Sequence, residues 1–108
     1  MGEQFQVAAA TITSTSSSVI LNPGTAATHV LRTLTLCNPS TASTTNASVT
    51  LYMANESASY TLFKYTQVTA AHTLLPATSP IVVSAGNRLE VSGGASDVDV
   101  SATYLELT

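Results

Sequence analysis

Near its end the chain reads Pro80-Ile81-Val82-Val83-Ser84, then Arg88-Leu89-Glu90-Val91-Ser92, then Asp97-Val98-Asp99-Val100-Ser101-Ala102-Thr103-Tyr104. In each run an apolar residue occupies every second position, which is the period of a β-strand with one buried face. The links Ala85-Gly86-Asn87 and Gly93-Gly94 contain residues that tolerate positive φ. We therefore expect three consecutive antiparallel strands with their apolar sides facing a core.

Shorter apolar runs recur along the rest of the chain, separated by turn residues at intervals of about 8–12 residues. No window combines apolar residues at helical spacing with good helix formers between them. The sequence therefore predicts an all-β fold with essentially no helix: an antiparallel β-sandwich, jelly-roll or Ig-like, with seven to nine short strands. The other strands are expected at residues 5–12, 19–21, 28–38, 47–54 and 59–68.

The clearest central strand is expected at residues 28–38, where Arg32 is the one Asp, Glu, Lys or Arg residue. Strict alternation places Val30, Leu34 and Leu36 on the same face as Arg32, and the odd-numbered residues 31–37 on the other face. Both faces are then largely apolar or neutral. This pattern is typical of a strand that is covered on both sides or that faces a neighbouring subunit.

The last strand contains a break in phase. Its inward positions run in steps of two from Val98 to Tyr104, yet the apolar residues Leu105 and Leu107 are out of phase with them. Two explanations remain open. Either a β-bulge at Tyr104–Leu105 shifts the register, or the two leucines face a second chain.

The length of 108 residues indicates a single domain. We divide it into an N-terminal arm and Ser/Thr-rich extended segment at residues 1–18, and a β-sandwich domain at residues 19–108. The arm carries Phe5 and Val7 in a weakly alternating segment. Together with Leu105 and Leu107, these are the residues that we expect at an interface.

Charged residues are unusually few. Asp, Glu, Lys and Arg make up 8% of the chain, whereas roughly 25% is usual in a soluble domain. Hydroxyl residues take their place, with 18 Thr and 14 Ser among 108 residues. Because charge is depleted at the cores of protein interfaces, and a low-charge surface on a strand-rich domain favours self-association, we expect a protein that is packed against partners.

Several classes of partner are disfavoured. The net charge is −3 and the three basic residues are scattered, whereas nucleic-acid binding needs a basic surface. No apolar run approaches the roughly 20 residues of a membrane-spanning helix, and the first residues do not resemble a secretory signal. The sequence predicts no nucleic-acid or membrane partner, and synthesis in a cytoplasm.

No motif for catalysis, for a cofactor or for a metal stands out. His29, His72 and Cys37 lack the spacing of a triad or metal site. We expect both histidines at the surface or in turns, and the cysteine as a packing residue. Asp97 and Asp99 supply two carboxylates where calcium needs six or more oxygens, so a solvated face is expected there. The sequence predicts no enzyme activity, no cofactor and no metal.

Four aromatic residues gather in two neighbouring strands: Tyr52, Tyr60, Phe63 and Tyr65. On one exposed face they would form a platform for a sugar. Packing in the core and between strands is the competing role, and the one that we favour.

Residues 19–107 resemble small virion proteins of tailed bacteriophages. Those proteins show a strand ending in a Cys-Asn or similar pair, a hairpin of apolar residues around Ala-Gly-Asp, and a closing Val-Asp-Val strand. Here Asn87 stands at the position of that Asp. The matching stretches are His29-Val30-Leu31-Arg32-Thr33-Leu34-Thr35-Leu36-Cys37-Asn38, Val49-Thr50-Leu51-Tyr52, residues 80–91 and Val98-Asp99-Val100.

The resemblance implies a non-enzymatic structural protein of a virion, made in the host cytoplasm. One form of this role is a decoration or cement protein that binds the major capsid protein lattice and stabilises the head. The alternative is a tail or baseplate β-domain that binds a glycan or receptor. The implied partners are the major capsid protein or another virion protein, with the chain itself a homo-oligomer.

Overall fold

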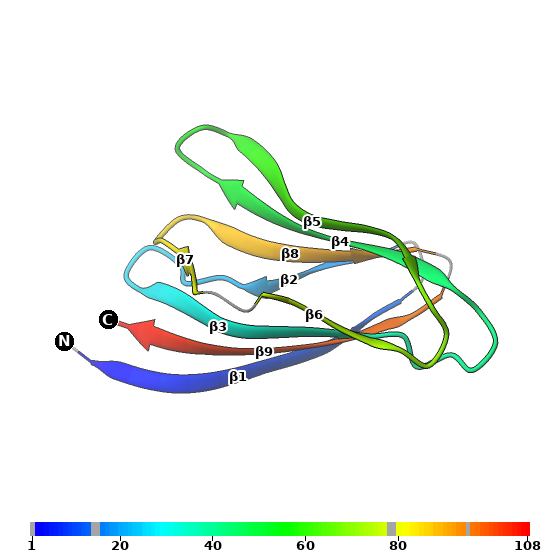
Figure 1. The fold of residues 1–108 in the computed structure, drawn as a ribbon. Coiled ribbons are helices and arrows are strands. Elements are labelled where there is room, and N and C mark those ends of the chain that lie inside the picture. The colour runs from blue at the N-terminus through cyan, green and yellow to red at the C-terminus, as the bar shows by residue number, and fades with distance from the viewer. Residues whose placement is uncertain (1, 14–15, 78–79, 95) are drawn as a thin grey trace.

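The computed structural model describes residues 2–13, 16–77, 80–94 and 96–108, which contain nine β-strands and no helix. The strands form two antiparallel sheets packed face to face (Figure 1). The predicted all-β sandwich is therefore confirmed. The strands are β1 Glu3–Ile12, β2 Ser17–Leu21, β3 Thr28–Cys37, β4 Thr45–Met53, β5 Ala58–Val68, β6 Thr73–Ala77, β7 Ile81–Val83, β8 Arg88–Gly93 and β9 Val98–Leu107.

The order of the strands in the two sheets identifies the topology of the sandwich. Sheet A has the order β1-β9-β3-β6, with β7 also paired to β3, and sheet B has the order β2-β8-β4-β5. The pairs β1–β9, β2–β8, β3 with β6 and β7, and β4–β5 are nested, so the chain runs like one long hairpin. Rolling up that hairpin adds the pairs β3–β9 and β4–β8. This arrangement is a jelly roll, not an Ig-like sandwich.

The last three strands are connected differently from the expectation. They are not hydrogen-bonded to one another, because β7 and β9 flank β3 in sheet A while β8 lies between β2 and β4 in sheet B. The short links therefore cross between the layers. Because β8 and β9 lie in opposite sheets, the apolar face of β8 packs against the apolar face of β9, and the two apolar faces are buried between the sheets. The predicted turn at Gly86 is confirmed, with φ of 87°.

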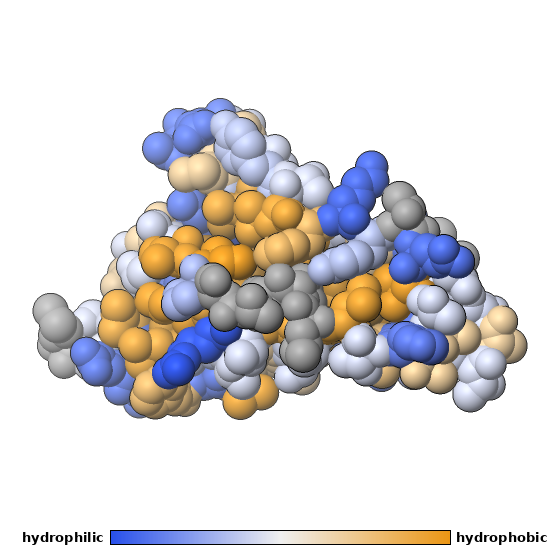
Figure 2. Space-filling view, in the orientation of Figure 1, coloured by the Kyte–Doolittle hydropathy of each residue, from blue (hydrophilic) through white to orange (hydrophobic). Residues whose placement is uncertain are grey.

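The core lies between the two sheets. Figure 2 shows hydrophobic residues gathered in a band between the layers, with more hydrophilic residues above and below. Burial of this apolar surface is the main force that stabilises the sandwich. The side chains with no exposed surface belong to both sheets and include Ile12, Leu31, Leu34, Leu36, Val49, Val83, Leu89, Val91 and Val98.

A β-bulge in β3 changes which of its residues face the core. Opposite β9 the register shifts between Leu31 and Thr33, so Arg32 is the extra residue. His29 and Leu31 are buried before the bulge, and Leu34 and Leu36 are buried after it. The expected strict alternation is therefore wrong for β3, because the bulge moves Leu31 to the inner face.

The break in phase of β9 does not come from a bulge in that strand. Strand β9 pairs with β1 without any shift from Val98 to Leu107, so the bulge lies on the neighbouring strand and not at Tyr104–Leu105. Tyr104 packs against the core. Leu105 and Leu107 consequently lie on the outer face of sheet A.

The segment expected as an N-terminal arm is largely part of the sandwich. Residues 3–12 form β1, which pairs with β9 along its whole length, and Ile12 is fully buried in the core. The terminal residues continue this ladder, since Gly2 and Thr108 each donate a backbone hydrogen bond to the other. Hydrogen bonding to β9 holds this segment in sheet A.

Two neighbouring residues of β7 test which face of this strand is buried in the core. Val83 is fully buried, whereas Val82 is 56% exposed. We expect Val83→Ala to lower the free energy of unfolding by about 2 kcal/mol, because it removes buried methyl groups and leaves a cavity. Val82→Ala should change it by less than about 0.5 kcal/mol. Urea unfolding of both variants measures this, and equal losses would contradict the assignment.

Candidate interaction surface

The outer face of sheet A presents a regular array of side chains. In an antiparallel sheet, directly paired residues point to the same side, so the registers of β1, β9, β3 and β7 give the layout. From the terminal end, the successive rows are Glu3, Leu107, Thr28; then Phe5, Leu105, Val30, Val82; then Val7, Thr103, Thr33; then Ala9, Ser101, Thr35; then Thr11, Asp99, Cys37.

The second of these rows is entirely apolar. We name Phe5, Leu105, Val30 and Val82 the apolar row; it crosses four strands and is therefore about 14 Å wide. Phe5 and Val82 are 73% and 56% exposed. Val7 in the adjacent row is 68% exposed. Scattered apolar residues are normal on a surface, whereas contiguous exposed apolar groups are typical of interaction sites.

Arg32 is held over the same end of the face. Its guanidinium carbon lies 5.6 Å from the centre of the Phe5 ring, within the range of a cation–π contact. The bulge in β3 leaves the Arg32 side chain exposed. From β3 this side chain reaches across β9 to the Phe5 ring on β1. A hollow of about 370 Å³ lies beside this contact, lined in part by Val7 and Thr103.

The remaining rows carry small and hydroxyl side chains. Thr33 and Thr103 hydroxyls are 2.5 Å apart, and the Thr35 hydroxyl donates to the Ser101 carbonyl at 3.2 Å. These neighbours satisfy each other's hydrogen-bonding groups, which lowers the cost of removing water from the face.

Charge is sparse on this side of the molecule. Among the residues that the structure describes, the charged side chains on it are Glu3, Arg32 and Asp99, and Asp99 accepts a 2.7 Å hydrogen bond from the Thr11 hydroxyl.

The outer face of sheet B is different in character. Arg88 lies 4.0 Å from the centre of the Tyr52 ring and donates a 2.9 Å hydrogen bond to Glu90. Lys64 is exposed on β5 and pairs with Ser48. The contrast makes the outer face of sheet A the candidate interaction surface.

The structure brings the four sequence-predicted interface residues together on that surface. Phe5 pairs directly with Leu105, while Val7 and Leu107 occupy the two flanking rows. That this face contacts a partner stays a prediction. The sequence reasoning missed Val30 and Val82, because only the order of the strands shows that they extend the same row.

The residues considered for catalysis or metal binding lie apart. The described residues contain no group of three or more His, Cys, Asp or Glu placed to hold a metal ion. His72 lies exposed in a turn, as expected, with its Nδ1 2.8 Å from the Ala70 carbonyl. Cys37 ends β3 on the outer face, paired with Asp99. No helix long and apolar enough to cross a membrane occurs within the described ranges.

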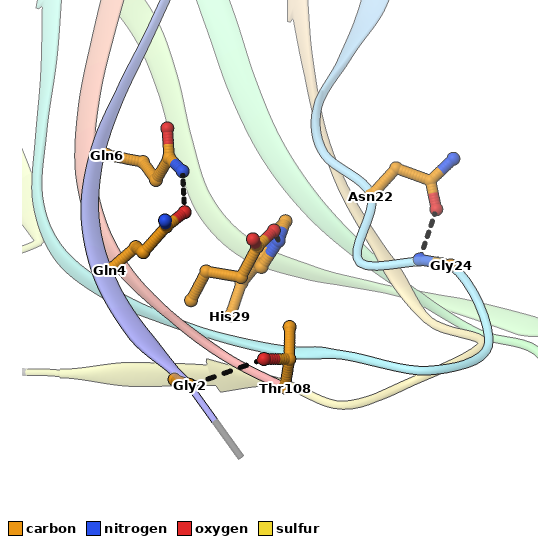
Figure 3. A network of polar contacts seen from close by, with 8 residues as sticks. Gly2, Gln4, Gln6, Asn22, Gly24, His29 and Thr108 are labelled. Carbon is orange, nitrogen blue, oxygen red and sulfur yellow. Dashed lines mark hydrogen bonds and ion pairs between the residues drawn. The ribbon is translucent and has the colours of Figure 1, made fainter.

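The expectation of a surface or turn position is wrong for His29. It is buried on the inner face, with its Nε2 2.9 Å from Glu106 Oε2 and its ring 4.5 Å from that of Tyr104. Figure 3 shows this end of the sandwich, where Gly2 and Thr108 close the ladder. Because His29 lies on β3 while Tyr104 and Glu106 lie on β9, the cluster was invisible to local sequence patterns.

The four aromatic residues do not form a platform. Phe63 and Tyr65 pack against the core, as favoured, whereas Tyr52 lies under Arg88 on the outer face of sheet B. Tyr60 is 46% exposed, and its hydroxyl donates to Glu56 at 2.5 Å.

Comparison with known proteins gives a likeness of fold. No family model and no curated protein matches the chain. A chain from the crystal structure of the T13 IBDV viral particle, described in the context of icosahedral virus evolution, matches 97% of this chain with a TM-score of 0.54 and 8% identity. This chain spans about a third of that one, 31% of its length.

Two further solved structures overlap less well. BH2720 from Bacillus halodurans has a TM-score of 0.45 and 14% identity, covering 96% of this chain and 64% of its own. A chain of infectious bursal disease virus Gt strain has a TM-score of 0.36 and 14% identity, covering 98% of this chain and 30% of its own.

The contact between Tyr60 and Glu56 can be tested by titration. The hydrogen bond to Glu56, together with the charge of that carboxylate, raises the pKa of Tyr60, because losing the proton would place two negative charges side by side. We expect Glu56→Gln to lower the pKa of Tyr60 towards its ordinary value, as followed by ¹³C NMR of the tyrosine ring. Glu90→Gln is the matched control and should leave it unchanged. An unaltered titration in Glu56→Gln would refute the contact.

Proposed function

We propose that the chain is a non-enzymatic structural protein of a virion that binds the particle's shell through the outer face of sheet A. In its finer form, the protein decorates or cements a tailed-phage head by binding the major capsid protein lattice as a homo-oligomer. The observation that carries this proposal is the apolar row, strongly exposed at Phe5 and Val82, on a face with few charges.

The fold supports the proposal independently of that face. The chain shares a β-sandwich with a chain of a viral particle, over nearly its whole length. The resemblance of its strands to small virion proteins of tailed bacteriophages points in the same direction. Jelly rolls also occur in lectins and cupins, so the surface decides between these uses.

The size of the face indicates how binding would work. Four strands of up to ten residues cover about 14 Å by 33 Å, on the order of 500 Å² per copy. This is below the roughly 800 Å² per partner of a standard stable interface. A single copy would bind weakly, and stable attachment would come from many linked copies acting together on a repeating lattice. Binding to the assembled shell alone then stabilises it by mass action.

A substitution in the apolar row tests the proposal. Val82 is exposed and lies on β7, so Val82→Lys should leave the fold intact while placing a charge in the interface. We expect at least about tenfold weaker binding to shells assembled from the major capsid protein of the same genome, measured by co-sedimentation.

The matched control is Val19→Lys, because Val19 is 45% exposed and lies on β2 in the other sheet. This variant should bind like the parent protein. Equal binding by the Val82→Lys variant and the parent would refute the role of this face, and no binding by the parent would refute the proposed function.

A further inference from the structure

Strand β1 forms one border of sheet A and can be followed along the lower edge of the molecule in Figure 1. In the part of the chain that the structure describes, β9 is the one strand hydrogen-bonded to it. The strand is ten residues long, contains no proline or lysine, and has no bulge against β9. Its one charged residue is Glu3. Natural edge strands normally carry a proline, a lysine or a bulge that prevents pairing with another chain, and β1 has none of these.

The backbone groups on the free edge of β1 can be assigned from the terminal pair. Gly2 and Thr108 donate to each other's carbonyl oxygen, so they form a hydrogen-bonded pair of the ladder. Because such pairs alternate along an antiparallel ladder, the even-numbered residues of β1 direct their N–H and C=O groups towards β9. The odd-numbered residues, from Glu3 to Thr11, direct theirs to the free edge.

We infer that β1 pairs in antiparallel fashion with β1 of a second copy of this chain, about a twofold axis at Val7. The odd-numbered residues carry the free backbone groups, and their side chains are all exposed. A register that pairs odd-numbered residues of one copy with odd-numbered residues of the other therefore satisfies these free backbone groups. It also places the outer face of sheet A of one copy beside that of the other. The register centred on Val7 uses all of them, giving about ten backbone hydrogen bonds.

The side chains of β1 fit a second copy in this register. Glu3 lies opposite Thr11 of the second copy, Phe5 lies opposite Ala9, and Val7 lies opposite Val7. No like charges meet, and the large Phe5 ring faces a small methyl group. The strand thus fits itself in size and places no like charges directly opposite each other, which is what favours a second copy over another protein.

The pairing would join two copies of sheet A into one continuous sheet. Because the twofold axis is perpendicular to that sheet, both outer faces point to the same side, and both apolar rows lie in one surface. The inference deepens the proposed function by naming a partner. The inference and the proposed function can fail independently of each other. Pairing of two copies is measured without shells, and Val82, which tests shell binding, lies on β7, three strands away from β1.

Charge substitution at Val7 tests the axis itself. The parent chain at high concentration should have twice the mass of the 11.1 kDa chain in light scattering. Val7→Lys alone and Val7→Glu alone should each weaken pairing at least about tenfold, because like charges then meet at the axis. An equimolar mixture of the two variants should pair at least as well as the parent, because opposite charges meet instead.

Proline supplies a second variant that leaves the inner ladder intact. The N–H of Val7 points to the free edge, so Val7→Pro removes the two symmetry-related hydrogen bonds of the Val7 pair between copies and none to β9. It should be monomeric with an unchanged circular dichroism spectrum, whereas Val7→Thr should pair like the parent. A monomeric parent, a dimeric Val7→Pro variant, or a Lys/Glu mixture that does not recover would each overturn the inference.

Discussion

Strand β9 hydrogen-bonds to β1 on one side and to β3 on the other, and the features of sheet A depend on this three-strand ladder. Its register with β1 is continuous from Glu3 to Ile12, while its register with β3 contains the bulge at Arg32. The continuous register with β1 places Leu105 on the outer face beside Phe5. The bulged side allows Val30 to join the same row although Leu34 and Leu36 face inward.

The few charges of the chain are distributed unequally over its surfaces. Glu106 lies on the inner face of β9 in contact with His29, and Arg88 and Glu90 form an ion pair on sheet B. The outer face of sheet A keeps little charge to hold water or to repel a second protein. A protein with 8% charged residues gains little solubility from charge repulsion, so the position of each charge determines which surface stays free and which is available for contact.

Among the residues whose burial the structure describes, the buried polar side chains lie at the two ends of the sandwich. His29 lies at the terminal end, whereas Asn38 and Thr45 lie at the other. The Asn38 amide donates to the carbonyls of Ser43 and Val68 at 2.8 and 2.9 Å, and it thereby holds two loops against the core. The Thr45 hydroxyl bonds both the N–H and the carbonyl of Ser96. The buried apolar faces specify the register of the strands, and these directional contacts at the ends add to that specificity.

The sequence by itself determined the class of the fold, because the two-residue period of apolar side chains reports burial of one strand face without knowledge of the neighbours. It also singled out Leu105 and Leu107, which are out of phase with that period, and Phe5 and Val7, which lie in the weakly alternating N-terminal segment. Only the tertiary structure decided which strands are neighbours. A strand's period says which residues share its face but not which strand lies beside it, so the sequence could not show that β7, β8 and β9 alternate between sheets. The bulge in β3, the burial of His29 against Glu106 and the extension of the apolar row to Val82 all follow from pairings between distant segments, which local patterns do not encode.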